Sequence, residues 1–165
     1  ECRRAARQLV QAEHGVTLTS LKQSPETYKG KVVILGGVII DKRVEPERVW
    51  LLIKNRPIDE DFVPHVPASL EGPEAGFYWV AVAPQGLPKS YQGWARLTVV
   101  GLVSDQPHPE VGIINPDTVL VALYMRGWGR GWGGYGTHEE AWEDTRSASS
   151  IMSAPKSILR TGQGQ

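Results

Sequence analysis

Five apolar runs of strand length, each bounded by proline, glycine or polar residues, constrain the fold of this chain most strongly. They are rich in β-branched and aromatic side chains, which pack well on a half-buried pleated surface. The runs cover residues 31–43, 49–53, 77–83, 93–103 and 118–125. All are far shorter than the roughly 20 apolar residues that a membrane-spanning helix requires. The pattern therefore predicts an all-β protein without a transmembrane helix.

Glycine interrupts two of the predicted strands, as Gly36-Gly37 in the first and as Gly101 in the fourth. Glycine inside a strand usually marks a bulge, a sharp coil or the close approach of another backbone. Strands that coil in this way can close on themselves. We therefore expect an OB-like small five-stranded barrel with a short N-terminal helix and an irregular C-terminal arm that is rich in tryptophan and glycine.

The chain divides into three predicted parts. Residues 1–27 include a short helix over 3–14 and a further helical turn at Ser24-Pro25, because serine caps helices and proline suits their first position. Residues 28–126 hold the five strands, and residues 127–165 form the arm and tail. The glycine-rich start of the arm loses much backbone entropy when it becomes ordered, so we expect a partner or a surface to hold it.

The charge balance gives no global preference for a partner. The 165 residues include 18 Lys and Arg and 18 Asp and Glu, so the formal net charge is zero. Nucleic-acid binding depends on positive charge along a groove, and the balance therefore argues against a nucleic-acid partner. Cys2 is the single cysteine and cannot form a disulfide within the chain.

No sequence motif assembles an active site or a metal site. The four histidines lack the spacing of local ligand pairs, since they stand at His14, His65, His108 and His138. The acidic clusters at 59–61 and 139–144 lack the spacing of a calcium loop and are interpreted as solvated charges. No serine occupies a Gly-x-Ser-x-Gly elbow. We therefore expect a protein that is not an enzyme, with no catalytic residue, no metal and no cofactor.

Aromatic residues supply the first candidate binding surface. Trp128, Trp132 and Tyr135 alternate with glycine beside Arg130, and aromatic side chains are common at protein interfaces and at the membrane–water interface. We expect these four residues to contact a partner protein or the lipid interface. The alternative is that the aromatic residues fold back onto the barrel as part of its core.

A second hypothesis assigns binding to the barrel itself. Trp50, Trp79 and Trp94 stand within or next to predicted strands, where their rings would stack on a small ligand or an oligosaccharide, as OB-type barrels allow. On this hypothesis the chain is a ligand-binding module rather than a docking subunit.

The order of several short motifs resembles the Slp (starvation lipoprotein) family of Gram-negative outer-membrane lipoproteins. The opening signature is YKGKVVILGGVI at 28–39, followed by a strand and proline turn, LLIKNRPID, at 51–59. A Gly-Phe step and the strand YQGWARLTVVGLV at 91–103 come next, and Trp128 with the glycine-tyrosine run matches the aromatic tail of the family. Asn115-Pro116 replaces a usual Tyr-Pro step, which indicates a divergent member.

The resemblance implies a location, an anchor and a role. In the family the cysteine that begins the mature protein is acylated, and Cys2 is the candidate here. Because Glu1 precedes it, either the mature chain begins one residue later or Cys2 is an ordinary thiol. The implied role is that of a structural or accessory subunit, held by lipid at the periplasmic face of the outer membrane and docked onto an envelope protein or complex.

Overall fold

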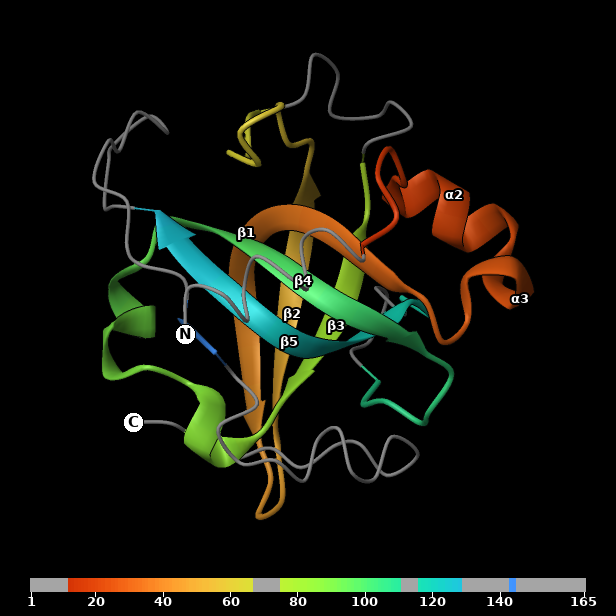
Figure 1. Cartoon of the computed structure of the whole chain (residues 1–165). Helices are drawn as coiled ribbons and strands as arrows, with labels where there is room; N and C mark the ends of the chain where they lie inside the picture. The colour runs from red at the N-terminus through yellow and green to blue at the C-terminus, as the bar shows by residue number, and fades with distance from the viewer. Residues whose placement is uncertain (1–11, 67–74, 111–115, 129–142, 145–165) are drawn as a thin grey trace.

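Five strands close into a β-barrel in the computed structural model, which describes residues 12–66, 75–110, 116–128 and 143–144 (Figure 1). The strands are β1 (Val32–Val44), β2 (Val49–Arg56), β3 (Phe77–Val82), β4 (Arg96–Ser104) and β5 (Val119–Trp128). They follow the order β3-β2-β1-β4-β5, and a parallel pairing between β3 and β5 closes the barrel. The prediction of an all-β barrel with five strands is confirmed.

In the described part of the N-terminal segment, two short helices precede the first strand. The helix α2 (Leu18–Gln23) begins after Thr17, whose hydroxyl accepts a hydrogen bond from the backbone N–H of Ser20 in a capping box. The helix α3 (Pro25–Tyr28) carries proline at its start, as the sequence predicts. Within the described residues, no helix has the length and apolar character needed to cross a bilayer.

The helix predicted over 3–14 falls mostly outside the described residues. At its end, Glu13 forms a parallel bridge with Val33, and its N–H donates to the carbonyl of Val32 at 2.8 Å. Residues 12–14 are therefore not helical, and the prediction is wrong for these three. A backbone that is paired with β1 cannot make helical hydrogen bonds at the same time.

Apolar side chains from all five strands fill the inside of the barrel. α2 closes one end through Leu18 and Leu21, while the 3-10 turns between β3 and β4 contribute Leu87 and Tyr91. The strand residues of this inner cluster are Val33, Leu35, Val49, Leu51, Ile53, Tyr78, Val80, Val82, Leu97, Val99, Val103, Leu120, Ala122 and Met125. Burial of this apolar surface is the main stabilising term of the fold.

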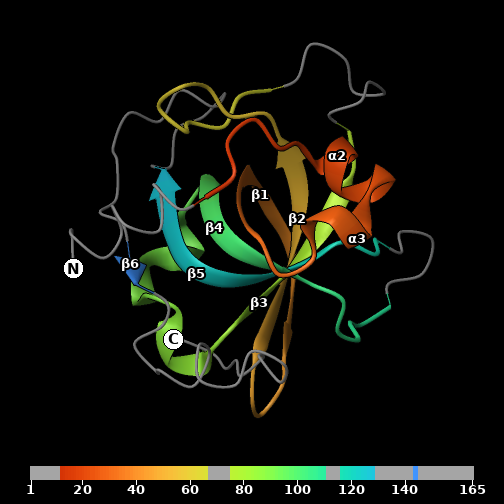
Figure 2. The same ribbon diagram turned by 45° about the vertical axis from the view of Figure 1, so that its right-hand side comes forward.

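A second apolar cluster lies on the outer face of the same strands. It includes the fully buried Trp50 and Trp79, whose rings meet edge to face at 5.9 Å. The guanidinium of Arg48 lies over the Trp50 ring, 5.6 Å from its centroid. Because both faces of the strands are apolar, the runs in the sequence are continuous rather than alternating. Figure 2 shows the strongly coiled sheet that separates the two faces.

Glycine stands where the coiled strands approach most closely. Gly36 and Gly37 lie at the point where β1 pairs with β4 on one side and with β2 on the other. A Cβ at Gly37 would overlap the Ile53 side chain and the Lys54 carbonyl oxygen, and one at Gly101 would stand 2.9 Å from the Cβ of Leu120. The close approach expected for these glycines is therefore present.

Candidate functional site

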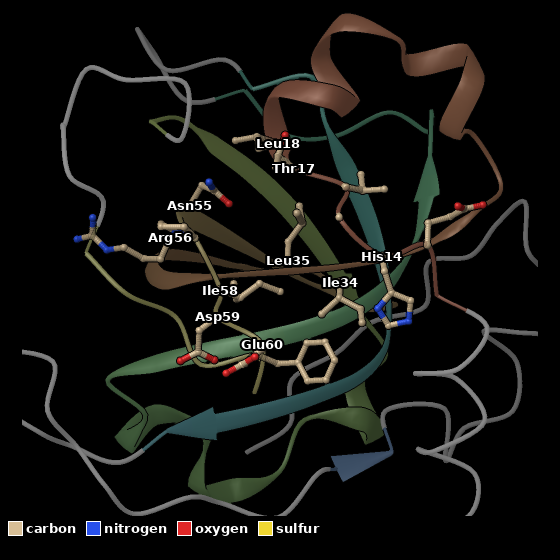
Figure 3. Close-up of a pocket in the computed structure, with 16 residues that line it drawn as sticks. His14, Thr17, Leu18, Ile34, Leu35, Asn55, Arg56, Ile58, Asp59 and Glu60 are labelled. Carbon is tan, nitrogen blue, oxygen red and sulfur yellow. The ribbon is translucent and has the colours of Figure 1, made fainter.

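A cavity of about 510 Å³ lies where the N-terminal segment meets β1 and the end of β2 (Figure 3). Three segments line it, and they are residues 13–18, residues 34–36 of β1, and residues 55–60 together with Phe62. The capping box of α2 fixes the first segment, and the ladder between β1 and β2 fixes the second. The cavity volume falls within the range of small-molecule sites, about 300–1,000 Å³.

The wall of this cavity is apolar and its margin is polar. Ile34, Leu35 and Ile58 face its centre, while Asp59 and Glu60 stand at one side (Figure 3). The buried side chain of Asn55 also lines it, with 3% of its surface exposed. Such a surface favours an apolar molecule that carries few polar groups.

Asp59 organises the loop that forms the lower wall. One carboxylate oxygen accepts hydrogen bonds from the backbone N–H groups of Asp61 and Val63, at 2.8 and 3.0 Å. The other oxygen meets Nε2 of His65 at 2.6 Å. Phe62, at the turn of this loop, has a positive φ of 64°, a conformation that is strained for a bulky side chain. The carboxylate therefore holds a loop conformation that the backbone alone disfavours.

The same contacts set the charge of Asp59. Burial raises the pKa of this carboxyl, but the hydrogen bonds from His65 and from the N–H groups of Val63 and Asp61 outweigh burial, so that the pKa lies below its ordinary value. Asp59 is therefore an anion at neutral pH. A carboxylate in this state is a structural acceptor and is unsuited to act as a proton donor.

The lowered pKa of Asp59 predicts an acid-sensitive loop. A carboxyl whose pKa is lower in the folded than in the unfolded state contributes stability above its unfolded pKa of about 3.9, and this contribution is lost as the pH falls through the folded pKa. We expect Asp59→Asn to flatten the decline in urea midpoint between about pH 5 and about pH 3, relative to the unmodified protein. Parallel curves for the two proteins would contradict this role of Asp59.

Two side chains of β4 fasten the same loop to the barrel. The Thr98 hydroxyl donates to the carbonyl of Phe62 at 2.5 Å, and Nη1 of Arg96 donates to the carbonyl of Pro64 at 2.7 Å. Thr98 in turn accepts a hydrogen bond from Nε1 of Trp128 at 3.0 Å. The loop is thus connected to β4 by the hydrogen bonds of Thr98 and Arg96, and through Thr98 to Trp128 of β5.

Trp128 is therefore not the exposed contact residue that the sequence suggested. It belongs to β5, it is 3% exposed, and the guanidinium of Arg126 covers its ring at 4.5 Å. Its indole N–H is satisfied inside the protein by Thr98. This placement agrees with the alternative that it folds back onto the barrel.

Removal of the Thr98 hydroxyl tests the hydrogen-bonded connection between the loop, β4 and β5. In Thr98→Val the indole N–H of Trp128 and the carbonyl of Phe62 both lose a buried partner, and we expect the free energy of unfolding to fall by about 2 kcal/mol. Thr98→Ser keeps the hydroxyl and should retain most of the stability. Urea denaturation followed by tryptophan fluorescence measures both variants, and equal losses in the two would argue against the hydrogen bonds.

Of the remaining predicted site residues, the structure describes the three tryptophans of the barrel. Trp50 and Trp79 are buried, with 1% and 0% of their surfaces exposed, which corrects the expectation that their rings are open to a ligand. Trp94 is half-buried against the inner cluster and lies over the backbone of Gly127. Four further predicted residues lie outside the described part of the chain, namely Cys2, Arg130, Trp132 and Tyr135.

The pairing of Asp59 with His65 was not foreseen, because the acidic run at 59–61 was interpreted as solvated charge. The available signal was an aspartate six residues before a histidine in a segment bounded by Pro57 and Pro67. Asp commonly accepts hydrogen bonds from the backbone a few residues on. The described residues contain no group of three or more His, Cys, Asp or Glu side chains that is placed to hold a metal ion.

Comparison with known protein families gives a match over most of the chain. A sequence model of the family described as "Outer membrane lipoprotein Slp family" matches residues 2–129, which include the first segment of the cavity and all five strands of the barrel. No match was found among the curated proteins or among the solved structures.

Proposed function

This chain belongs to the Slp family of outer membrane lipoproteins, and we propose that it acts in the outer membrane as a non-catalytic accessory subunit that docks onto another envelope protein. The proposal places the barrel at the periplasmic face, with Cys2 acylated as its anchor. Each methylene of an acyl chain that enters the bilayer contributes about 0.8 kcal/mol, so several chains on one cysteine would hold the protein firmly.

The observation that carries the docking role is the hairpin of β1 and β2. β4 pairs with β1 only as far as Gly37, whereas β2 pairs with it as far as Val44. Beyond Gly37, β1 therefore pairs with β2 alone among the described strands, while β2 stays paired with β3 as far as Val49. The end of this hairpin, called the ribbon below, points away from α2 and α3 (Figure 1). Ile40, at a bulge, and Val44 are 45% and 53% exposed.

The charges of this ribbon support a docking surface of mixed character. Arg43 pairs with Asp41, and Arg48 pairs with Glu45, so the ribbon largely neutralises its own charge. The exposed apolar side chains of Ile40 and Val44 are therefore surrounded by ion pairs. A protein interface has a similar arrangement, with an apolar core inside a polar rim. The segment with Arg130, Trp132 and Tyr135 remains part of the proposed contact.

The non-catalytic part of the proposal rests on Asp59 at the cavity wall. Its carboxylate is an anion at neutral pH and accepts hydrogen bonds that hold the loop together, which suits a structural role. The order of the strands, with β1 between β2 and β4 and with β3 beside β5, further supports an OB-like classification of the barrel.

Site-specific cross-linking in the native envelope tests the docking role. A photo-reactive residue at position 44 should give one discrete cross-linked product, because Val44 stands on the projecting ribbon. The matched control is position 27, which is exposed on α3, far from the ribbon tip (Figure 1). Ile40→Glu should abolish the product from position 44. A product that forms equally from both positions, or that survives Ile40→Glu, would refute docking through the ribbon.

The anchor has its own test. Intact-mass spectrometry of the protein from outer membranes should show the added mass of acyl chains on Cys2, and Cys2→Ser should move the protein into the soluble fraction. An unmodified thiol on membrane-bound protein would exclude the lipid anchor and leave the docking proposal standing.

A further inference from the structure

We infer that the docking partner adds a short extended strand to the open edge of β1 in the ribbon, with an acidic residue opposite Lys42. Strand addition rests on the docking role proposed above and deepens it, because the partner is then held by its backbone as well as by its side chains. In this mode of binding, main-chain hydrogen bonds supply affinity and alternate side chains supply specificity. The edge must therefore offer backbone groups that no other strand uses.

The second half of β1 has a neighbouring strand on one side. β4 pairs with β1 as far as Gly37, and beyond it the pairing of β1 with β2 continues to Val44. β2 is in turn paired with β3 over the same stretch. Within the described strands, residues 38–44 of β1 are therefore the edge of a three-stranded sheet.

The hydrogen bonds at the hairpin turn show which backbone groups point to the open side of this edge. Glu45 and Arg48 exchange both N–H···O bonds, at 2.8 and 3.3 Å, so they form a hydrogen-bonded pair. Such pairs alternate along an antiparallel ladder with pairs that exchange no hydrogen bond. The next pair, Val44 with Val49, is thus of the second kind. The N–H and C=O of Val44 therefore point away from β2.

The same alternation applies two residues earlier in β1. Lys42 lies opposite Leu51, and its backbone groups also point away from β2. Its N–H donates to Oδ1 of Asp41 at 2.8 Å, which agrees with an N–H that lies outside the ladder. In the described part of the chain, the edge thus offers a new strand three backbone groups, namely the C=O of Lys42 and both groups of Val44.

The edge is open over a short stretch. The register of the ladder shifts between Ile39 and Asp41, which places a bulge at Ile40. A bulge disrupts the ladder and bends its strand, so one straight strand cannot pair on both sides of it. Bulges and charged side chains also protect an edge from indiscriminate pairing, as Asp41 does when it occupies the N–H of Lys42. The open stretch therefore fits a short, specific segment rather than a further sheet.

The charge of Lys42 gives the preference for an acidic residue. The two ion pairs of the ribbon described above do not involve Lys42, and its ammonium lies over the ring of Tyr91, 5.6 Å from the centroid. Residues directly opposite each other in an antiparallel pair attract when their charges are opposite. An acidic residue is thus favoured opposite Lys42, and an apolar one opposite Val44, which is 53% exposed.

A second copy of the chain fits this edge poorly. An antiparallel pairing that uses the open groups of both copies sets Lys42 of each copy opposite Val44 of the other, and Arg43 then lies opposite Arg43. Like charges in this position destabilise the pair of strands. A pairing centred on Lys42 opposes two lysines, and one centred on Val44 places Pro46, which has no N–H, opposite Lys42. The occupant is therefore a segment of another protein.

Hydrogen exchange of the purified full chain tests whether the edge is open. The amide of Arg43, which forms a hydrogen-bonded pair with Trp50 by the same alternation, should exchange at least about tenfold more slowly than the amide of Val44. NMR measures both rates. Equal protection of the two amides would overturn strand addition, because the N–H of Val44 would then not differ from one that is bound in the ladder.

Two substitutions of Val44 separate backbone docking from side-chain docking. Val44→Pro removes the N–H at the open edge, which proline tolerates at such positions, whereas Val44→Ala shortens the side chain and keeps the N–H. A p-benzoylphenylalanine at position 47, in the exposed turn of the ribbon, reports docking in the native envelope. We expect Val44→Pro to lower the yield of cross-linked product by about tenfold or more, and Val44→Ala by no more than about threefold.

A charge reversal tests the acidic residue of the partner. Lys42→Glu should lower the yield from position 47 by about tenfold, because two carboxylates would then lie opposite each other. Lys22→Glu is the matched control, since Lys22 is exposed on α2, away from the ribbon (Figure 1). Equal yields from these two variants would refute the acidic residue.

The outcomes distinguish strand addition from the docking role itself. An equal loss in Val44→Pro and Val44→Ala, or an unchanged yield in folded Val44→Pro, would refute strand addition and leave docking through side chains standing. A product with the mass of two copies of the chain would refute another protein as the occupant. The absence of any product from the ribbon would refute the docking role. If Val44→Pro loses its cooperative urea transition, Lys42→Pro replaces it, because the N–H of Lys42 also lies outside the ladder.

Discussion

Gly37→Ala is expected to lower the free energy of unfolding by about 3 kcal/mol, because the barrel has no space for one additional methyl group at this position. A Cβ there would overlap both the side chain of Ile53 and the backbone carbonyl of Lys54 on the neighbouring strand. The carbonyl oxygen cannot rotate away as a flexible side chain can, since it belongs to the ladder between β1 and β2. In the variant, β1 and β2 must therefore move apart or lose their native pairing at this point.

Gly30→Ala is the matched control for this prediction. Gly30 has a positive φ of 82°, and nothing lies within 4 Å of the Cβ that alanine would add. Alanine there is strained only by its own backbone conformation, because a Cβ is disfavoured at a positive φ, and this strain costs about 1 kcal/mol. Urea denaturation of the two variants separates close packing from backbone strain. A larger loss in Gly30→Ala than in Gly37→Ala would contradict the packing explanation.

The positions of the strands were predictable from the sequence because each strand is an apolar run with clear breaks. The run at 49–53, for example, corresponds to β2, and that at 118–125 to most of β5. The glycines of β1 indicated coiled strands, and coiled strands in turn indicated a sheet that closes into a barrel. These signals come from residues that are neighbours in the sequence, so they can be recognised without knowing the tertiary contacts.

The face on which each tryptophan lies was not predictable, because both faces of the barrel strands are apolar. In β2, Val49 through Ile53 are all buried, so alternation gives no way to distinguish inside from outside. Trp50 was consequently interpreted as a ligand platform although it lies in the outer cluster. Trp128 was assigned to the glycine-rich arm although β5 continues through it.

The cavity was not predictable either, because its wall depends on contacts between distant residues. Thr98 and Phe62 are 36 positions apart, and their hydrogen bond forms only when β4 lies beside the loop after β2. The positive φ of Phe62 has no sequence signal, since glycine or asparagine would be expected there. A site that is built from long-range contacts can be recognised only when the fold is known.

Trp79→Ala is expected to lower the free energy of unfolding by about 4 kcal/mol, since removal of a buried indole forfeits its transfer free energy and leaves a cavity. Trp79 is fully buried on β3, directly beside the point where β3 pairs with Val119 of β5 and closes the barrel. Trp50→Ala should have a loss of similar size, because the two rings are packed edge to face.

A double-mutant cycle on Trp50 and Trp79 distinguishes a core role from a ligand-stacking role. Two buried rings at 5.9 Å with an interplanar angle of 77° should show a coupling free energy of about 0.5–1.5 kcal/mol beyond their burial. Val66→Ala serves as the exposed control, and it should change stability by no more than about 0.5 kcal/mol. If the tryptophans instead presented open faces for stacking, both single variants would resemble this control. Because the outer cluster includes residues from all five strands, we expect the loss to appear in the global unfolding transition rather than in a local one.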